Sequence, residues 1–226
     1  MKKSLILCFL IFSFSILTAQ IPYPKTLSGH VEFGPSFYNL KDLNELLIRP
    51  DSGYLAFTQP IFGFGFGMDY NTNRWMIGGT LDAYVFSGPG LRTDRFQLAL
   101  LNYAYAKAKL GYVVYFGDLD NKPFLLFPSV GVGGGFSRLR TNRAGLATFS
   151  INQDWGLLYD FSMNMHWFPP IITTEASSVK MGASIGYLYA PGKNSWNLSN
   201  FGDDDRLRVS PQGFYVRLIF GMTGGL

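Results

Sequence analysis

The stretch Phe149–Trp167, FSINQDWGLLYDFSMNMHW, alternates between two kinds of residue. Its odd-numbered positions are apolar or aromatic and its even-numbered positions are polar or small; only Gln153 and Leu158 depart from this pattern. Side chains of a β-strand point alternately to the two faces of a sheet, whereas an amphipathic helix repeats every 3.6 residues and would mix the two kinds. The stretch therefore predicts one long strand with an apolar face and a polar face.

The same alternation recurs along most of the chain. Between Phe62 and Tyr70, for example, large apolar residues alternate with glycine and aspartate. We predict eight strands at about 28–39, 55–70, 74–86, 95–116, 123–138, 147–168, 178–190 and 209–222. Pro60 lacks a backbone donor, which predicts a bulge in the second strand or a late start. The connections alternate between tight turns, such as 71–73, and longer loops, such as 40–54 and 191–208.

The composition is that of a membrane protein, yet no segment is long enough for a membrane helix. Of 226 residues, 47% are hydrophobic, 17% aromatic and 15% charged, against about 25% charged in soluble domains. This composition excludes a disordered chain, and a scattered net charge of +4 argues against a nucleic-acid binder. The longest apolar run, Ser4–Leu17, falls short of the roughly 20 residues that a spanning helix needs. The lone Cys8 excludes an internal disulfide and a cysteine-based zinc site.

The N-terminus has the pattern of a secretory signal peptide. Two lysines precede the apolar run, and the small residue Ala19 precedes a cleavage site before Gln20. We therefore expect residues 1–19 to be a signal peptide that directs export, and residues 20–226 to form a single β-barrel domain.

A sheet that faces lipid has to close on itself, because a free edge would leave backbone groups unpaired in hydrocarbon. With its alternating strands, short turns and longer loops, the chain resembles the small eight-stranded outer-membrane β-barrel family of Gram-negative bacteria. Its segment Gly213–Phe220 is similar to the C-terminal strand recognised by the barrel-assembly machinery, although Met222–Leu226 follow where the family ends on an aromatic residue. The resemblance implies an all-β fold, a closed antiparallel eight-stranded transmembrane barrel, in the bacterial outer membrane. It leaves the function open.

The alternation places a nearly balanced set of charges on the inner face. The acids are Glu32, Asp69, Asp82, Asp154 and Asp160, and the bases are Lys107, Lys109, Lys180 and Arg217. Buried charges are costly unless they are paired. We therefore predict a salt-bridge network in the lumen, of the kind that the family resemblance also implies. A narrow pore and a functional site are the alternatives.

No pattern of catalytic or cofactor-binding residues stands out. Barrel enzymes that modify lipid A, which are similar in size, need a histidine and a serine near the outer leaflet, supported by a carboxylate. Both histidines, His30 and His166, instead fall near the periplasmic ends of their strands. The glycine runs at 63–67 and 131–135 precede no helix, so we interpret them as strand faces that admit large side chains from the far wall. We expect no enzyme activity, no cofactor and no metal.

Arginines gather at the end with the longer loops. We predict that five of them contact the phosphates of lipopolysaccharide, because arginine binds phosphate in a bidentate manner. These five are Arg92, Arg95, Arg138, Arg140 and Arg143. The alternative is a solvated loop in which they pair with Asp94 and with Asp203, Asp204 and Asp205.

These observations favour a non-enzymatic outer-membrane barrel with a structural, partner-binding or surface-binding role, such as an accessory subunit of an envelope complex. Its expected partners are outer-membrane lipid, lipopolysaccharide and an envelope protein, and not nucleic acid. The alternatives are a narrow pore for small solutes and a lipid A-modifying enzyme.

Overall fold

The computed structural model describes residues 25–40, 44, 59–72, 74–88, 91–92, 95–118, 123–143, 149–169, 173–174, 177–191 and 212–225. The expected signal peptide, residues 1–19, lies outside these ranges. Among the described residues, none forms a helix long and apolar enough to cross a membrane.

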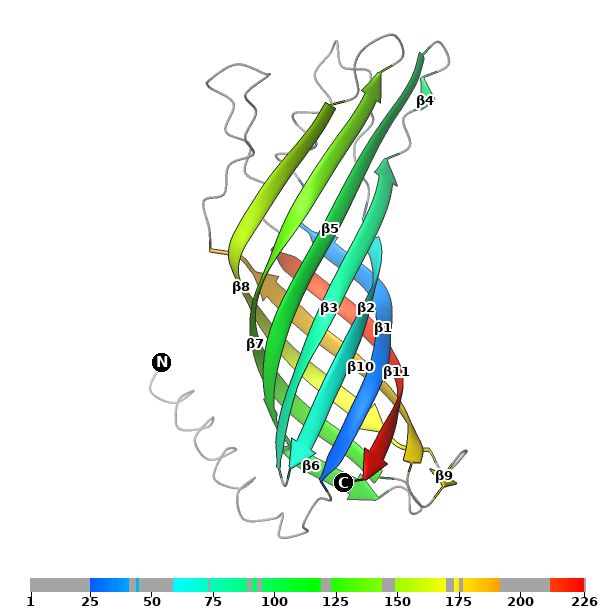
Figure 1. Cartoon of the computed structure of the whole chain (residues 1–226), viewed down its shortest axis with the longest axis vertical. Helices are drawn as coiled ribbons and strands as arrows, with labels where there is room; N and C mark the ends of the chain where they lie inside the picture. Colours follow the sequence, from blue (N-terminus) through cyan, green and yellow to red (C-terminus); the bar gives the residue numbers. More distant parts are fainter. Residues whose placement is uncertain are drawn as a thin grey trace, which may run out of the picture.

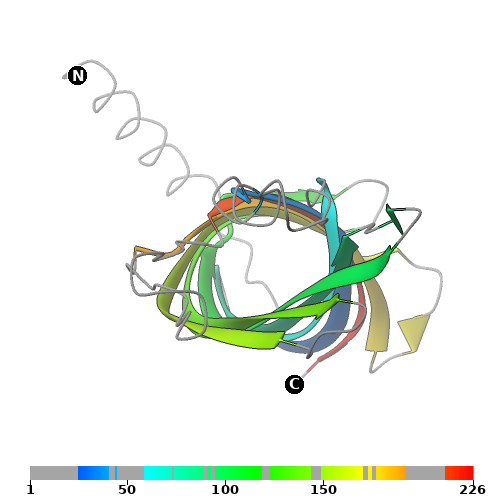
Figure 2. The ribbon, with the colours of Figure 1, turned by 90° about the horizontal axis from the view of Figure 1, so that it is seen from above.

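Eight long antiparallel strands close into one barrel (Figure 1). They are β1 (Thr26–Tyr38), β2 (Ile61–Thr72), β3 (Trp75–Gly88), β5 (Arg95–Tyr112), β7 (Pro123–Arg143), β8 (Phe149–Trp167), β10 (Ser177–Tyr189) and β11 (Gly213–Gly225). Around the ring they follow the order β5-β3-β2-β1-β11-β10-β8-β7, and a β5–β7 pairing closes it (Figure 2). The predicted fold class is confirmed. Strand β2 begins directly after Pro60, which agrees with the late start that this proline predicted.

The strands are tilted because their pairing is staggered. Following paired residues once around the barrel from Ser28 returns to β1 at Tyr38, ten residues further along the same strand. The path runs through Asp69, Gly78, Lys109, Gly131, Asp160, Leu188 and Gly213. Strand number and stagger together fix the tilt and width of a barrel, and eight strands leave an interior that side chains just fill.

The two ends of the barrel differ. At one end, β2 and β3 are joined by a turn of two residues, whereas at the other end residues 39–60 and 190–212 connect β1 to β2 and β10 to β11. Strands β5, β7 and β8 have 18, 21 and 19 residues and rise beyond the other strands at the long-loop end (Figure 1). Two short strands, β4 (Leu91–Arg92) and β9 (Thr173–Thr174), pair with β5 and β10.

The predicted continuous strand 95–116 is wrong at its end. Gly111 pairs with Ser129 on β7, but Tyr115 pairs with Leu126, so this side of the ladder carries one residue more. The extra residue interrupts β5 after Tyr112 and starts β6 (Tyr115–Asp118). A bulge resets the alternation, and Tyr115 faces outward with 56% of its surface exposed.

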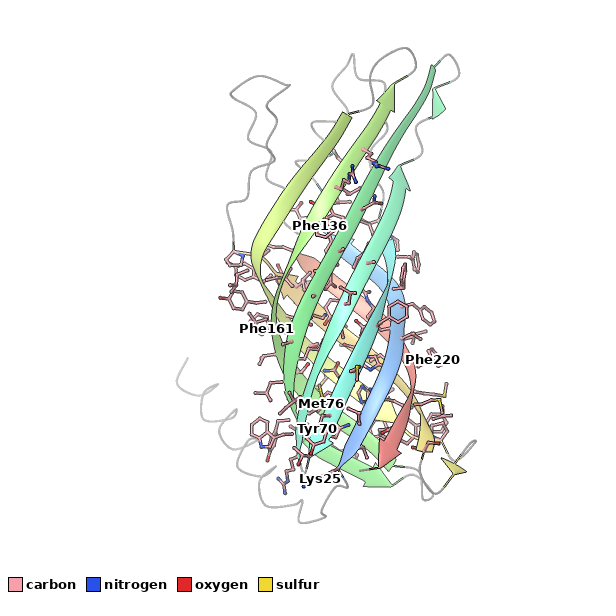
Figure 3. All side chains as sticks on the ribbon, viewed as in Figure 1. Lys25, Tyr70, Met76, Phe136, Phe161 and Phe220 are labelled. Atoms are coloured by element: carbon pink, nitrogen blue, oxygen red, sulfur yellow. The ribbon has the colours of Figure 1, made fainter. Side chains whose placement is uncertain are left out.

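The outer face of the wall is apolar and the inner face is polar. Phe66, typical of the outer face, is 59% exposed, and Phe161 and Phe220 point away from the barrel on opposite sides (Figure 3). Along β1 and β2 buried and exposed residues alternate almost without interruption. This two-sided pattern is the one that a barrel surrounded by lipid requires.

Inner-face glycines make room for large polar side chains. Gly63 pairs with Tyr84, Gly67 with His30, and a Cβ atom added to either glycine would lie 2.2 Å from the facing ring. The glycine runs are therefore strand faces, as predicted. The side chains they admit come from the directly paired position on the neighbouring strand, and not from the far wall as expected, because neighbouring strands are much closer than opposite walls.

Candidate functional site in the barrel interior and at the arginine rim

The interior holds four carboxylates and four cations among the described residues, and all eight are buried. They are Glu32, Asp69, Asp82 and Asp160, with Lys107, Lys109, Lys180 and Arg217. The backbone of Asp154 belongs to β8, and its side chain lies outside the described part. The described interior charges therefore sum to zero, which buried charges require if their desolvation is to be offset.

A compact group around Lys180 lies toward the short-turn end. The Lys180 ammonium on β10 lies 2.5 Å from Asp69 Oδ2 on β2 and 3.2 Å from His30 Nδ1 on β1. It also donates to Ser28 Oγ at 3.3 Å. Since β1 and β11 separate β2 from β10 in the sheet order, this ion pair ties together two non-adjacent parts of the wall.

A second group surrounds Lys107 on β5. Its ammonium lies 2.7 Å from Asp160 Oδ2 on β8 and 3.8 Å from Asp82 Oδ2 on β3. Both carboxylates have a further partner, because Tyr215 Oη donates to Asp160 at 2.6 Å and Thr80 Oγ1 donates to Asp82 at 3.1 Å. Next to this group, Lys109 lies 3.9 Å from Glu32 and joins β5 to β1.

Arg217 is held by neutral acceptors. Its Nη2 donates to Ser36 Oγ at 2.7 Å and to the Tyr84 hydroxyl. Its Nη1 donates to the backbone carbonyls of Gly34, Pro35 and Val216 at 2.9–3.1 Å. The guanidinium carbon also lies about 5 Å from the ring centroids of Tyr84 and Tyr215, which is cation–π distance. No described carboxylate is within ion-pair distance, so Arg217 is held differently from the lysines.

An apolar cluster lies in the interior near the short-turn end. Met76, Leu125, Phe127 and Phe168 pack together there, with Val113 against them. Met76 is the second residue of β3, and Figure 3 shows it in the lower part of the barrel. Charged groups cannot cross such a cluster without losing their hydration. The interior thus contains both buried ion pairs and, near the short-turn end, a cluster of apolar side chains.

Alternation predicted which charges face inward, but it did not predict several of their partners. Ser28, Ser36 and Thr80 hydrogen-bond to the charged groups, and His30 contacts Lys180. All lie on the inner face by the same period of two, so continuing the alternation to neutral polar residues would have found them. That the whole set stabilises the barrel as a network stays a prediction.

Ser28, His30 and Asp69 are residue types of a catalytic triad, but their geometry is different. In a triad the imidazole bridges serine and carboxylate through its two nitrogens. Here the same nitrogen, His30 Nδ1, lies 3.4 Å from Asp69 and 3.2 Å from Lys180, while Nε2 faces Gly67. Ser28 Oγ donates to the Asp69 carbonyl oxygen at 3.4 Å and accepts from Lys180. The arrangement fixes side chains and does not activate the serine.

Two of the five predicted phosphate-binding arginines have described side chains. Arg138 and Arg140 follow Phe136 at every second position of β7, so they share its outward face. In the ladder Arg138 pairs with Asn102 on β5 and Asn152 on β8. The apolar outer face of β7 therefore gives way to charged residues beyond Phe136. The side chains of Arg92, Arg95 and Arg143 lie outside the described part, as do Asp94 and residues 203–205 of the alternative.

Three solved structures are similar to the chain. Neisserial surface protein A matches with a TM-score of 0.41 and 10% identity, over 92% of this chain and 100% of its own. The attachment invasion locus protein Ail of Yersinia pestis matches with a TM-score of 0.46 and 12% identity, over 90% and 99%. Ail in complex with the heparin analogue sucrose octasulfate gives 0.44 and 11%, again over 90% and 99%.

No protein-family model and no curated protein sequence matches the chain. The fold follows from the strand pairing itself, which closes eight antiparallel strands into a ring. The fold is that of a closed, antiparallel, eight-stranded β-barrel.

Proposed function

We propose that the mature chain is exported and resides in the bacterial outer membrane as a non-enzymatic β-barrel. One observation carries the proposal: large apolar side chains cover the outer face of a closed barrel whose inner face is polar. Soluble monomers rarely expose apolar patches beyond a few hundred Å², and hydrocarbon is the solvent in which such a surface is stable. Residues 1–19, expected to be a signal peptide, would supply export.

The interior supports a structural or binding role over transport. Lys180 and Asp69, like Lys109 and Glu32, join strands that are not neighbours in the sheet. The apolar cluster of Met76, Leu125, Phe127 and Phe168 lies beneath them. A barrel filled in this way would pass no ions, so specificity would reside at the end with the long connections, where an envelope protein partner would bind.

Lipopolysaccharide is the second partner that we propose. Arg138 and Arg140 stand on the outward face of β7, directly beyond the apolar Phe136. Long loops of bacterial barrels face the cell exterior, so this level corresponds to the phosphorylated head groups of the outer leaflet. Guanidinium groups bind phosphate with paired hydrogen bonds. We include Arg92, Arg95 and Arg143 in this rim on their sequence positions alone.

Insertion into vesicles tests the proposal. The mature chain, refolded with phosphatidylcholine vesicles, is expected to float with the lipid, to show a heat-modifiable electrophoretic band and to resist protease along its strands. In planar bilayers the same protein is expected to pass no steady current. Failure to insert would overturn the membrane barrel, whereas insertion with a stable conductance would favour the pore.

Affinity purification from native membranes in mild detergent tests the partner. A stoichiometric envelope protein is the expected result. Recovery of the barrel with lipid alone would count against the accessory-subunit role and would leave a free-standing structural barrel. Mass spectrometry of lipid A from cells with and without the protein tests for enzyme activity. We expect the two masses to be identical, and a change in acylation would overturn the non-enzymatic assignment.

A further inference from the structure

The outer wall contains an apolar groove near the short-turn end. Its volume is about 390 Å³, within the range of ligand-binding pockets. The lining comes from three neighbouring strands: Trp75 on β3, Leu110, Gly111 and Tyr112 on β5, and Pro128, Ser129 and Val130 on β7. Almost no polar atom is exposed in it. Such a dry groove suits hydrocarbon and does not suit a polar solute.

The groove lies where the strand ladder is interrupted. Strand β5 ends at Tyr112. The Val113 amide then donates to the Arg74 carbonyl oxygen at 2.8 Å, and the Val114 amide donates to the Leu126 carbonyl oxygen on β7 at 3.0 Å. Residues Val113 and Val114 carry the extra residue that restarts the strand at Tyr115. Bulges bend the strand that carries them. The hollow is thus built into the backbone and does not depend on one side-chain rotamer.

One margin of the groove is aromatic and carries a positive charge. The rings of Trp75 and Tyr112 meet edge to face with centroids 5.0 Å apart. The Arg74 guanidinium donates to Tyr112 Oη at 3.2 Å, which holds it beside this margin. Tryptophan and tyrosine prefer the level of lipid head groups, and arginine suits phosphate. A dry groove with an aromatic and cationic margin matches one acyl chain and the phosphate of the same lipid.

We propose that this groove binds one phospholipid of the leaflet on the short-turn side, with an acyl chain along Leu110 and Val130 and its phosphate on Arg74. The inference rests on the proposed membrane location of the barrel. The position in the lipid-facing wall and the charge complementarity with Arg74 favour a lipid over a protein segment or a second copy of the chain. This site faces the opposite leaflet from the Arg138 and Arg140 rim, so the two arginine sites would hold different lipids.

Two pairs of matched variants test the site. Arg74→Gln removes the charge inside the proposed site. Lys25→Gln removes an exposed charge at the same end of the barrel, directly before β1. Val130→Trp fills the groove, and Val132→Trp places the same side chain two residues further along β7, outside the lining. Val130 and Val132 are 53% and 48% exposed, so the second pair is matched in environment. Heat-modifiable mobility of each variant verifies folding.

The measurement is native mass spectrometry of the delipidated full-length mature protein titrated with dioleoylphosphatidylglycerol, with dioleoylglycerol as the phosphate-free probe. We expect one retained phosphatidylglycerol and weaker retention of the diacylglycerol. Arg74→Gln should weaken binding about tenfold, the effect of losing one charge-assisted hydrogen bond. Val130→Trp should weaken binding of both probes, with an affinity loss of about fourfold for each lipid methylene group displaced from the groove. Lys25→Gln and Val132→Trp should leave affinity unchanged.

Equal losses in the test and control variants would overturn the site, as would the absence of a retained lipid. A dimer that Val130→Trp abolishes would also overturn it and would assign the groove to a second copy. These outcomes are distinct from failure of the proposed function, because a barrel that inserts into vesicles without retaining a lipid loses only this inference.

Discussion

The two faces of the same strands obey different rules. On β5, Lys107 points inward and contacts two carboxylates, while the adjacent Ala106 is exposed on the outer face. The inner face needs a specific residue at each position because charges and hydrogen bonds demand matching groups. The outer face needs only apolar character. The identity of individual residues therefore matters more on the inner face of each strand than on its outer face.

Replacing Lys107 is expected to cause the largest loss of stability and so to give the clearest difference between the two faces. Lys107→Met leaves Asp160 and Asp82 buried without their cation, and removing one partner of a buried pair costs about 3–5 kcal/mol. Ala106→Met, the same new side chain one residue away on the outer face, should change the free energy of unfolding very little. Urea titration of the folded band in detergent micelles measures both. Equal stability of the two variants would show that the lysine is not part of a stabilising network.

Arg217 tests whether neutral acceptors matter as much as ion pairs. Arg217→Ala removes the donors to Ser36, Tyr84 and three backbone carbonyls, and each buried acceptor left unpaired costs about 1–3 kcal/mol. Part of this loss is offset where the cavity admits water, so we expect an effect slightly below that of Lys107→Met. The melting temperature should fall, while binding at the loop end stays the same. Val216→Ala, on the outer face, is the control, and an unchanged melting temperature for Arg217→Ala would contradict the network.

The period of two explains how much of this interior was predictable. A strand residue's face follows from its parity alone, so the eight inward charges with described side chains, from Glu32 on β1 to Arg217 on β11, were assigned correctly. Which acid meets which base depends on the ten-residue stagger, and nothing in the local sequence fixes that stagger. The pairing of Lys107 with Asp160 therefore required the structure. Parity also failed after Tyr112, because one extra residue reverses the faces of β6 relative to β5.

The interior glycines extend the comparison from charge to volume. A Cβ atom on the inner-face Gly133 would lie 2.0 Å from the backbone oxygen of Ala106, whereas one on Gly29, on the outer face of β1, would meet nothing within 4 Å. Backbone cannot yield as a flexible side chain does, and overpacking costs about 1–3 kcal/mol. Gly133→Ala should therefore lower the urea midpoint and Gly29→Ala should not. If both variants unfold at the wild-type midpoint, the wall is more deformable than this packing implies.

The smallest expected effect concerns the loop end of the outer face, where charged side chains follow the apolar ones. Arg138 and Arg140 interrupt its apolar character at the loop end, and if they bind lipopolysaccharide phosphates the outer face has a ligand there. Exposed ion pairs contribute about 1 kcal/mol or less each, so Arg138→Gln with Arg140→Gln should lower co-purified lipopolysaccharide by up to about fivefold for each arginine and leave folding intact. Lys25→Gln, an exposed cation at the other end, should not change it, because lipopolysaccharide occupies only the outer leaflet. An unaltered yield in the double variant would sink the phosphate contact, and the outer face would then be uniform in its demands up to the loops.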